Sequence, residues 1–354
     1  MPFALNPPEA LLVALAPDGL IDEFAEVDAD AAEQAEIRTL CMGVAQHGQR
    51  LDRSLADLVI EFSRNYLQQL LVQGAVTLNG QVVSKASQRI KAGDQVCVEM
   101  RETLQSQAFR AEPMDIQVVH EDEHLLVLHK PAGLVVHPAP GNWSGTLLNG
   151  LLARDPRAAL LPRAGIVHRL DKDTSGLMVV ARSRQAMDAL VRMIAERKVS
   201  RQYLALAHRP WKGATTRTVD APIGRDPRNR LRMAVVDLSL YPGKLAKTDL
   251  HFLTGNDLGC LVKCTLHTGR THQIRVHMAL ISHPLLADTL YGGSAVADMK
   301  RQALHAFRLA FVHPMTGQHL DLYAPLPLDM RQSLVAWGLS YNESQWTQGS
   351  AHCV

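Results

Sequence analysis

The sequence predicts an α+β protein in which a small domain precedes a larger one. Its 354 residues exceed one ordinary domain, and 47% hydrophobic with 20% charged residues is typical of a chain that buries a core. Residues 41–101 contain two helical patterns followed by strand patterns, whereas residues 114–340 are dominated by short strand patterns. The polar segment 102–113 lacks apolar periodicity and ends in a proline, so we expect a linker there.

The two ends of the chain differ in composition from the body. Residues 1–40 hold nine acidic residues and one basic residue, while the whole chain has a net charge of +2. We expect this acidic extension to be mostly disordered, and the polar tail 341–354 to be frayed. A basic body behind an acidic extension is compatible with nucleic-acid binding, although an ordinary solvated surface fits the charges as well.

The small domain has the pattern of two helices, a hairpin and a last strand. Apolar residues recur at helical spacing, and Ser63 is placed to cap the second helix, which Gly74 ends; the apolar positions are Leu51, Leu55, Leu58, Phe62, Leu67, Leu70 and Leu71. Asn79-Gly80 predicts a tight type I′ turn between strands at 75–78 and 81–83, because both central residues of that turn need positive φ. A final strand is expected at 95–100.

The larger domain has strand patterns separated by two recognisable helices. Short apolar runs bounded by turn residues predict strands at Ile116–Val119, Leu125–Leu128, Leu134–Val136, Leu177–Ala181 and Arg201–Ala207. Ser183 is placed to cap a helix that turns Ala186 and Leu190 inward. Thr271 is placed to cap a second helix that runs to Ile281.

The segment 165–176 concentrates polar and charged residues in a turn directly before an apolar strand. A carboxylate held there beside Arg169 and Lys172 stays ionised, because nearby positive charge favours the charged form. Such a group can act as a nucleophile or a base. The alternative is that Asp171 or Asp173 only ties the turn through hydrogen bonds to the backbone.

A second cluster, residues 266–283, contains four histidines and Arg275. The histidines at 267, 272, 277 and 283 do not have the i, i+4 spacing of a helical zinc site, and no acid lies between 261 and 283. We therefore expect structural histidines and no metal. Arg275 lies on the expected helix, where it can pair with a buried carboxylate. Tyr203 can face the core or stack on a base.

Some functional classes are disfavoured by what the chain lacks. There is no apolar run of about 18 residues that would predict a membrane span. The five cysteines form no C-x-x-C pair, so a disulfide framework and a zinc finger are poor fits, and a reducing cytoplasm suits them best. No P-loop and no Rossmann glycine fingerprint occurs, which disfavours nucleotide cofactors.

The ordered motifs along the chain resemble those of the RluA-type pseudouridine synthases. Residues 165–176 (GIVHRLDKDTSG) match the family signature, and further matches follow in the same order at 130–138, 201–203, 268–277, 283–286, 301–305 and 313–317. Residues 41–101 resemble the S4 RNA-binding domain through Gly48–Arg53, Gly74–Gly80 and Lys91–Asp94. The resemblance covers about residues 41–335.

The resemblance implies a fold and a reaction. The fold is a small S4 (α-L) RNA-binding domain followed by a synthase domain whose mixed, mostly antiparallel and bent β-sheet is flanked by helices and loops. The reaction is isomerisation of uridine to pseudouridine in RNA, without cofactor or metal. The chain most resembles the branch that modifies 23S rRNA of the large subunit, so the implied partner is 23S rRNA or the pre-50S particle, for a cytoplasmic monomer without membrane contact. Another 23S site, tRNA or mRNA, or a non-catalytic ribosome-assembly role, stays open.

The resemblance also implies roles for four residues. Asp171 corresponds to the catalytic aspartate, which either attacks C1′ or abstracts the C2′ proton. Arg275 corresponds to the arginine that pairs with it. Tyr203 corresponds to the tyrosine that stacks on the flipped uracil, and Arg169 to the arginine that fills the space left by the flipped nucleotide.

Two groups of basic residues are candidates for RNA phosphate contacts. The first, in the S4-like region, is Arg50, Arg53, Arg64, Lys85, Arg89 and Lys91. The second, a polar strip after Gly224, is Arg225, Arg228, Arg230 and Arg232. The sequence departs from the family pattern at Leu245, Ala287 and Thr289. We expect these departures to affect loops or substrate choice and not the catalytic set.

Overall fold

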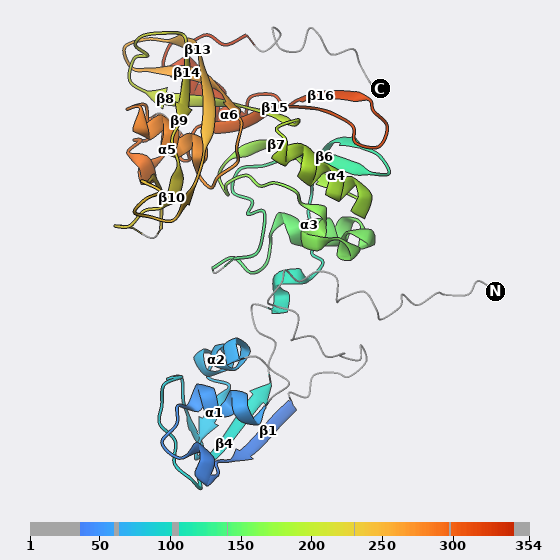
Figure 1. Ribbon diagram of the computed structural model, residues 1–354, viewed down its shortest axis with the longest axis vertical. Helices are drawn as coiled ribbons and strands as arrows, with labels where there is room; N and C mark the ends of the chain where they lie inside the picture. The colour runs from blue at the N-terminus through green and yellow to red at the C-terminus, as the bar shows by residue number, and fades with distance from the viewer. Residues whose placement is uncertain are drawn as a thin grey trace, which may run out of the picture. The chain divides into compact units, whose positions relative to one another are not determined.

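A computed structural model describes residues 36–59, 64–100, 106–139, 141–229, 231–296 and 299–342. The chain divides into two compact units (Figure 1). The small unit lies within residues 1–112 and takes in 138–144, and the large unit comprises 113–137 and the residues from 145 onward.

The small unit is a four-stranded antiparallel sheet with two helices. The sheet order is β1-β4-β2-β3, and the elements are β1 (Glu36–Cys41), α1 (Leu51–Leu58), α2 (Arg64–Val72), β2 (Val76–Leu78), β3 (Gln81–Val82) and β4 (Gln95–Met100). Leucines of both helices pack with Val76, Val96 and Val98 of the sheet into one buried core. Asn79 and Gly80 have φ of 51° and 80°, so the expected type I′ turn is confirmed.

The small domain begins earlier than the sequence indicated. Residues 36–40 were expected to belong to the disordered extension, but they form most of β1, whose six residues all pair with β4. Acidic composition masks this strand, because its stability comes from backbone hydrogen bonds to a partner far along the chain. The rest of the extension, Phe62, the Ser63 cap, residues 101–105 of the linker and the tail beyond 342 lie outside the described residues.

The large unit is built on a nine-stranded sheet of order β5-β6-β7-β15-β8-β14-β13-β9, with β16 paired to β15. Only the β7–β15 pair of this sheet is parallel, so the predicted mixed, mostly antiparallel sheet is confirmed. The strands are β5 (Gln117–Glu121), β6 (Leu125–Lys130), β7 (Ser175–Ala181), β8 (Ser200–His208), β9 (Thr216–Asp220), β13 (Lys247–Gly255), β14 (Gly259–Leu266), β15 (Leu304–Val312) and β16 (His319–Tyr323). A β-bulge between Ala306 and Arg308 interrupts β15 against β8, and such bulges bend strands.

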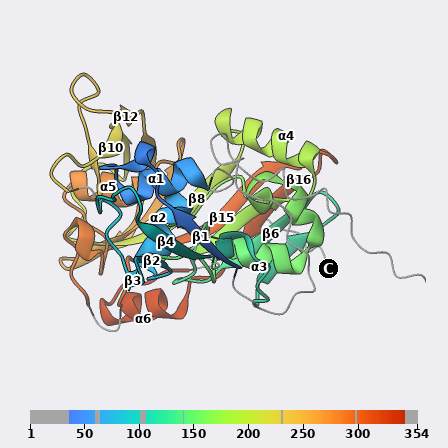
Figure 2. The ribbon, with the colours of Figure 1, turned by 90° about the horizontal axis from the view of Figure 1, so that it is seen from below.

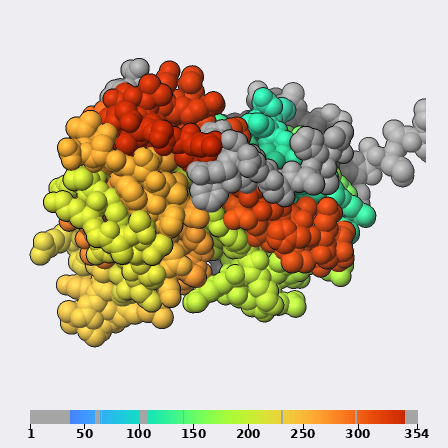
Figure 3. All heavy atoms as spheres, turned by 90° about the horizontal axis from the view of Figure 1, so that it is seen from above, coloured from blue at the N-terminus to red at the C-terminus, as the bar shows by residue number. Residues whose placement is uncertain are grey.

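Both faces of this sheet are buried, and alternate residues of each strand serve different cores. One face packs with α3 (Leu147–Arg154) and α5 (Gln273–Leu280), and it receives Tyr203 from β8. The opposite face is covered at one end by α4 (Arg184–Ala195), which lies near β6 and β16 in Figure 2. At the other end, α6 (Leu328–Ala336) covers the same face of the sheet. In Figure 3 the red atoms of the C-terminal segment lie beside orange atoms from earlier in the chain.

The parallel contact between β7 and β15 depends on a glycine. Gly176 has φ of 120°, and a Cβ at this position would lie 2.2 Å from the Ala306 carbonyl oxygen. A side chain would therefore separate the two strands. Since residues 171–174 lead directly into β7, this close contact also places the loop that carries Asp171.

Local predictions were partly right. Ser183 caps α4, because its hydroxyl oxygen accepts the Ala186 N–H at 3.2 Å. The strand expected at 134–136 is wrong: the carbonyls there accept hydrogen bonds from the Lys130 ammonium and from the first amides of α3, so none is left for a sheet. The Thr271 cap is also wrong. His272, with φ of 56°, is the N-cap residue of α5, and Gln273 ties the preceding loop by accepting from the Arg270 N–H.

A short three-stranded sheet stands apart from the main one in the large unit. It consists of β11 (Met233–Val235), β10 (Ile223–Arg225) and β12 (Gly243–Lys244), paired antiparallel. Ile223 and Ala246 pack with Val276 of α5 in a small core. This contact fixes the strip of basic residues to the same helix that carries Arg275.

Candidate active site

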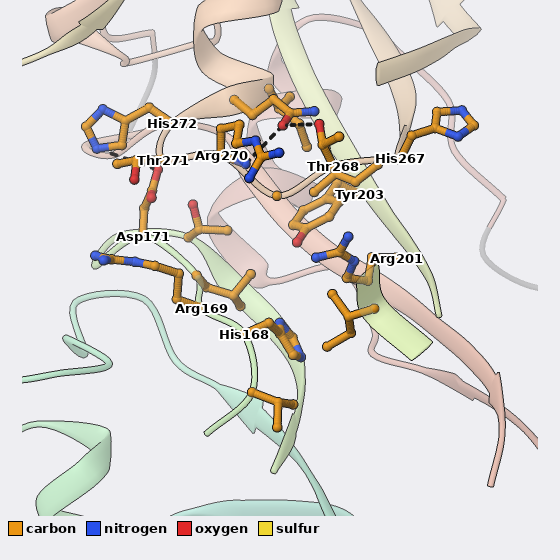
Figure 4. Close-up of a pocket in the computed structure, with 18 of the residues that line it drawn as sticks. His168, Arg169, Asp171, Arg201, Tyr203, His267, Thr268, Arg270, Thr271 and His272 are labelled. Carbon is orange, nitrogen blue, oxygen red and sulfur yellow. Dashed lines mark hydrogen bonds and ion pairs between the residues drawn. The ribbon is translucent and has the colours of Figure 1, made fainter. Parts of the chain in front are cut away.

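The large unit contains a cavity of about 680 Å³ that is lined mainly by two loops, by β8 and by the first turn of α5. One loop, residues 166–174, carries Asp171 and Arg169, and the other, residues 266–272, leads into α5. Tyr203 and Arg201 project into the cavity from β8, opposite Asp171 and Arg169 (Figure 4). The two sequence motifs that carried candidate chemistry therefore face one another.

Asp171 and Arg275 form an ion pair in this cavity. Nη1 of Arg275 donates to Oδ2 of Asp171 at 3.2 Å. The Asp171 side chain is 16% exposed and that of Arg275 is 8% exposed. A carboxylate in this position remains reachable from the cavity, while the guanidinium that donates to it fixes its orientation.

Arg275 is itself held by a second carboxylate. Asp288 is 2% exposed and accepts from Nε of Arg275 at 2.7 Å and from Nη2 at 2.9 Å, which is a bidentate pair. The Tyr291 ring lies 5.0 Å from the guanidinium carbon. Burial opposes the charge of Arg275, but Asp288 and then Asp171 outweigh it and raise the pKa of Arg275 above its ordinary value.

His272 extends this network on the other side of Asp171. Its Nδ1 lies 2.8 Å from the Tyr291 hydroxyl, which also accepts the Met233 N–H at 2.9 Å. Its Nε2 lies 3.9 Å from Oδ2 of Asp171. Burial lowers the pKa of His272, so the ring is mostly neutral at pH 7 despite the carboxylate nearby.

Tyr203 and Arg169 both line the cavity, but they differ in exposure. Tyr203 is 5% exposed, and burial raises its pKa to about 12, so its phenol is protonated at neutral pH. Arg169 is exposed at the rim and has no ion-pair partner in the described part of the chain. A ring on one wall and an unpaired cation at the opening suit a flat base and a nucleic-acid backbone.

The loop that carries Asp171 is tied to the sheet by a buried lysine. Lys130 is fully buried, and its ammonium donates to the carbonyls of Pro131 at 2.7 Å, Leu134 at 2.8 Å and Lys172 at 2.9 Å. Burial lowers the pKa of Lys130 to about 7, while each of these carbonyls favours the charged form. Because Lys172 follows Asp171, the Lys130 ammonium ties the loop that carries Asp171 to the end of β6.

Sequence reasoning missed several members of this site: Lys130, His168, Arg201, His272, Asp288 and Tyr291. Asp288 did have a signal in the sequence. A buried Arg275 needs a carboxylate partner, the stretch from 261 to 283 has no acidic residue, and Asp288 is the first one after it. Ala287 and Thr289 were set aside as departures from a family pattern, and the residue between them anchors Arg275. The other residues carried no local signal.

In the small unit, the predicted phosphate contacts fall into two groups. Arg50 and Arg64 both donate to the buried carboxylate of Asp52, at 3.0 Å and 2.8 Å, and Arg89 donates to the Gly48 carbonyl, so these three help to hold the fold together. Asp52 accepts hydrogen bonds from Arg50, Arg64 and Gln68. These bonds keep its pKa well below the usual range, although burial acts in the opposite direction. Arg53, Lys85 and Lys91 are exposed without ion pairs among the described residues.

The basic strip after Gly224 is divided in the same way. Arg232 pairs with the buried Asp226 at 2.6 Å, so its charge is balanced although its side chain is 42% exposed. Arg225 and Arg228 are exposed, and Arg230 lies outside the described residues. The strip therefore presents fewer cations than its four arginines suggest.

The four histidines of the second cluster do not converge. His267 pairs with Asp249, His277 lies between Thr248 and the Ala221 carbonyl, and His283 lies near the His208 carbonyl. Within the described ranges, no group of three histidine, cysteine or acidic side chains is arranged to hold a metal ion. Over the same ranges, no helix is long and apolar enough to cross a membrane.

Comparison with known proteins identifies the type of both domains. Residues 124–280 match the family model described as RNA pseudouridylate synthase, and residues 49–96 match the S4 domain. Both matches fall on the domains that the motifs had indicated.

Similar whole proteins extend the match over most of the chain. The ribosomal large subunit pseudouridine synthase D of Neisseria meningitidis serogroup B is 44% identical, over 90% of this chain and 89% of that protein. The protein of the same name from Nitrosomonas europaea is 45% identical, over 82% and 84%. The structure of human RNA pseudouridylate synthase domain containing 1 covers 71% of this chain and 96% of its own, at 26% identity and a TM-score of 0.50. With its S4 domain, its mixed sheet and its ordered motifs, this chain belongs to the RNA pseudouridylate synthase family.

Proposed function

We propose that this protein isomerises uridine to pseudouridine in 23S rRNA of the large ribosomal subunit, with Asp171 as the catalytic residue. The substrate follows from the relatives named as large-subunit synthases. The observation that carries the catalytic assignment is the Asp171–Arg275 pair, which lies in an arginine-lined cavity opposite Tyr203.

The reaction breaks the bond between N1 and C1′, turns the uracil and joins C5 to C1′. The C5 proton is lost and N1 gains one, so nothing is oxidised or added. Attack on C1′ and removal of the C2′ proton both need an ionised carboxylate held close to the ribose. The guanidinium of Arg275, fixed by Asp288, supplies that orientation.

Tyr203 and Arg169 are proposed to stabilise the RNA when the uridine is flipped out of its stack. A uridine paired in a stem must leave its stack to reach Asp171, which costs a few kcal/mol. The buried ring of Tyr203 offers a stacking surface for the flipped uracil. Arg169, exposed next to the catalytic loop, is placed to fill the space that the uridine leaves in the RNA.

The S4-type unit is proposed to bind the RNA backbone through Arg53, Lys85 and Lys91. Contacts to phosphates position a protein on RNA but carry little sequence information. Selection of the uridine therefore falls to the cavity and its rim.

The test is pseudouridine mapping of 23S rRNA from cells that lack the gene, complemented with wild type or with Asp171→Asn. We expect pseudouridines of one stem-loop to return with wild type and not with the variant. The purified variant should bind the same RNA within a few fold of wild type, because the change is isosteric. An unchanged map would refute the 23S substrate, and parallel loss of binding and folding would make Asp171 structural.

A further inference from the structure

Arg201 is a buried cation that the proposed reaction does not use. It is 6% exposed and lines the same cavity as Asp171 and Tyr203. Its Nε is buried without a hydrogen-bond partner, and no ion pair reaches its guanidinium in the described part of the chain. Buried charges left unpaired are costly, and proteins rarely keep them without a ligand or a partner.

His168 presents a second unpartnered donor to the same cavity. Its Nε2 accepts the Val179 N–H at 3.0 Å, so this nitrogen carries no proton. In a neutral imidazole the proton then lies on Nδ1, which is buried and has no partner among the described residues. Arg201 lies close enough to lower the pKa of His168, and both lie on one side of the pocket in Figure 4.

A glycine makes room for the guanidinium. A Cβ at position 269 would lie 2.9 Å from Nη1 of Arg201, and its three nearest atoms all belong to that guanidinium. The loop 266–272 thus passes directly over the guanidinium only because it has a hydrogen at this position. Arg201 is held between this loop and the phenol of Tyr203, whose pKa it also influences (Figure 4).

The cavity as a whole favours an anion. Its lining includes six arginines and one carboxylate, that of Asp171. Of these arginines, Arg275 is neutralised by Asp288, whereas Arg163, Arg169, Arg197 and Arg201 have no carboxylate partner in the described ranges. A uracil edge presents an N3–H donor between its carbonyls, and a site made only of donors would leave that group unpaired. A non-bridging phosphodiester oxygen is only an acceptor, so it fits a site that is lined by donors.

We propose that Arg201 and His168 form a phosphate subsite, which binds a non-bridging oxygen of a phosphodiester flanking the flipped uridine. This inference rests on the proposed function. Arg201 and Tyr203 lie two residues apart on the same face of β8, about 7 Å along the strand, which is within the span of one nucleotide. The stacked base and the bound phosphate therefore belong to the same nucleotide, and the pair of contacts aligns its ribose with Asp171.

The test is a binding cycle between a protein charge and an RNA charge. Three versions of an RNA stem-loop that contains the target uridine are prepared. One is unmodified, one has a methylphosphonate in place of the phosphate on the 5′ side of the uridine, and one has it on the 3′ side. Each is titrated with the Asp171→Asn protein, which keeps the substrate intact, and with the same protein carrying Arg201→Gln. We expect Arg201→Gln to weaken binding of the unmodified RNA by about tenfold to a hundredfold. One of the two methylphosphonates should weaken RNA binding by the protein that retains Arg201 by the same factor. It should have no further effect on RNA binding by the protein that carries Arg201→Gln.

Two further variants keep the test informative. Arg192→Gln removes an exposed arginine of α4 outside the cavity, and its effect should be additive with both methylphosphonates. Gly269→Ala should reproduce the loss seen with Arg201→Gln, because the new methyl displaces only the end of a flexible side chain, and thermal unfolding should show that this variant remains folded. Additive effects of Arg201→Gln at both phosphates would overturn the proposal and leave a water or a base carbonyl as the occupant. If wild type forms no pseudouridine in this RNA, the proposed function fails, while the binding cycle still reports on the subsite.

Discussion

Replacing Asp288 by asparagine tests whether Arg275 must be held from behind. The Asp288 carboxylate is 1% exposed and accepts two hydrogen bonds from Arg275, at 2.7 Å and 2.9 Å. Asparagine keeps the shape, but it turns one acceptor into a donor that faces a guanidinium N–H. We expect the buried pair to be broken and Arg275 to move relative to Asp171.

The magnitude follows from burial and from the remaining contacts. Removing one partner of a buried ion pair costs about 3–5 kcal/mol. Arg275 keeps Asp171 at 3.2 Å and the Tyr291 ring, so we expect about 3 kcal/mol of lost stability. A displacement of about 1 Å in a positioning group can lower the rate by about a hundredfold, so kcat should fall by that order with little change in KM.

The assay combines denaturant unfolding with release of tritium from C5 of labelled uridine in RNA. Asp321→Asn is the matched control, because Asp321 forms a bidentate pair with Arg308 at 2.7 Å and 2.8 Å that is about a quarter exposed. The control should lose about 1 kcal/mol or less and keep its rate. Equal stability losses in the two variants would refute the argument from burial, and an unchanged kcat in Asp288→Asn would refute the positioning role.

Three further predictions concern the loop anchor, pH and salt. Lys130→Met removes the ammonium that donates to three carbonyls, so unfolding should need about 3 kcal/mol less and single-turnover isomerisation should slow. A stable variant of full activity would contradict the anchoring role. His305 is fully buried, and burial lowers its pKa from 6.5 to about 3. At pH values between about 3 and 6.5 the ring is therefore neutral in the folded protein and takes up a proton when the protein unfolds. Stability should therefore fall with decreasing pH, by about 2 kcal/mol from this residue between pH 7 and 5, and unfolding of His305→Gln over that range should show a shallower slope. Lys85→Gln with Lys91→Gln should lower the slope of log K against log salt for RNA by about 1.5, and an unchanged slope in titrations would remove them from the interface.

Much of the fold could be predicted from sequence because its signals are local. Asn79-Gly80 specified a turn through backbone conformation, and Ser183 began a helix through one hydrogen bond to a residue three positions on. Short apolar runs bounded by turn residues located β6 and β7, and an alternating pattern located β8. Where a segment's backbone bonds went elsewhere, as at 134–136, the same reasoning gave a strand that does not exist.

The sequence by itself determined the family and the order of the domains, and it nominated the residues proposed for the chemistry, because the motifs around Asp171, Tyr203 and Arg275 are contiguous and ordered. Only the tertiary structure decided what surrounds them: that Asp288 anchors Arg275, that Lys130 binds the carbonyl beside Asp171, and that Arg201 is buried without a partner among the described residues. The reason is that partners of buried charges are chosen in three dimensions. A guanidinium or an ammonium pairs with whichever acceptor the closed sheet brings within about 3 Å, and that choice leaves no periodic trace along the chain.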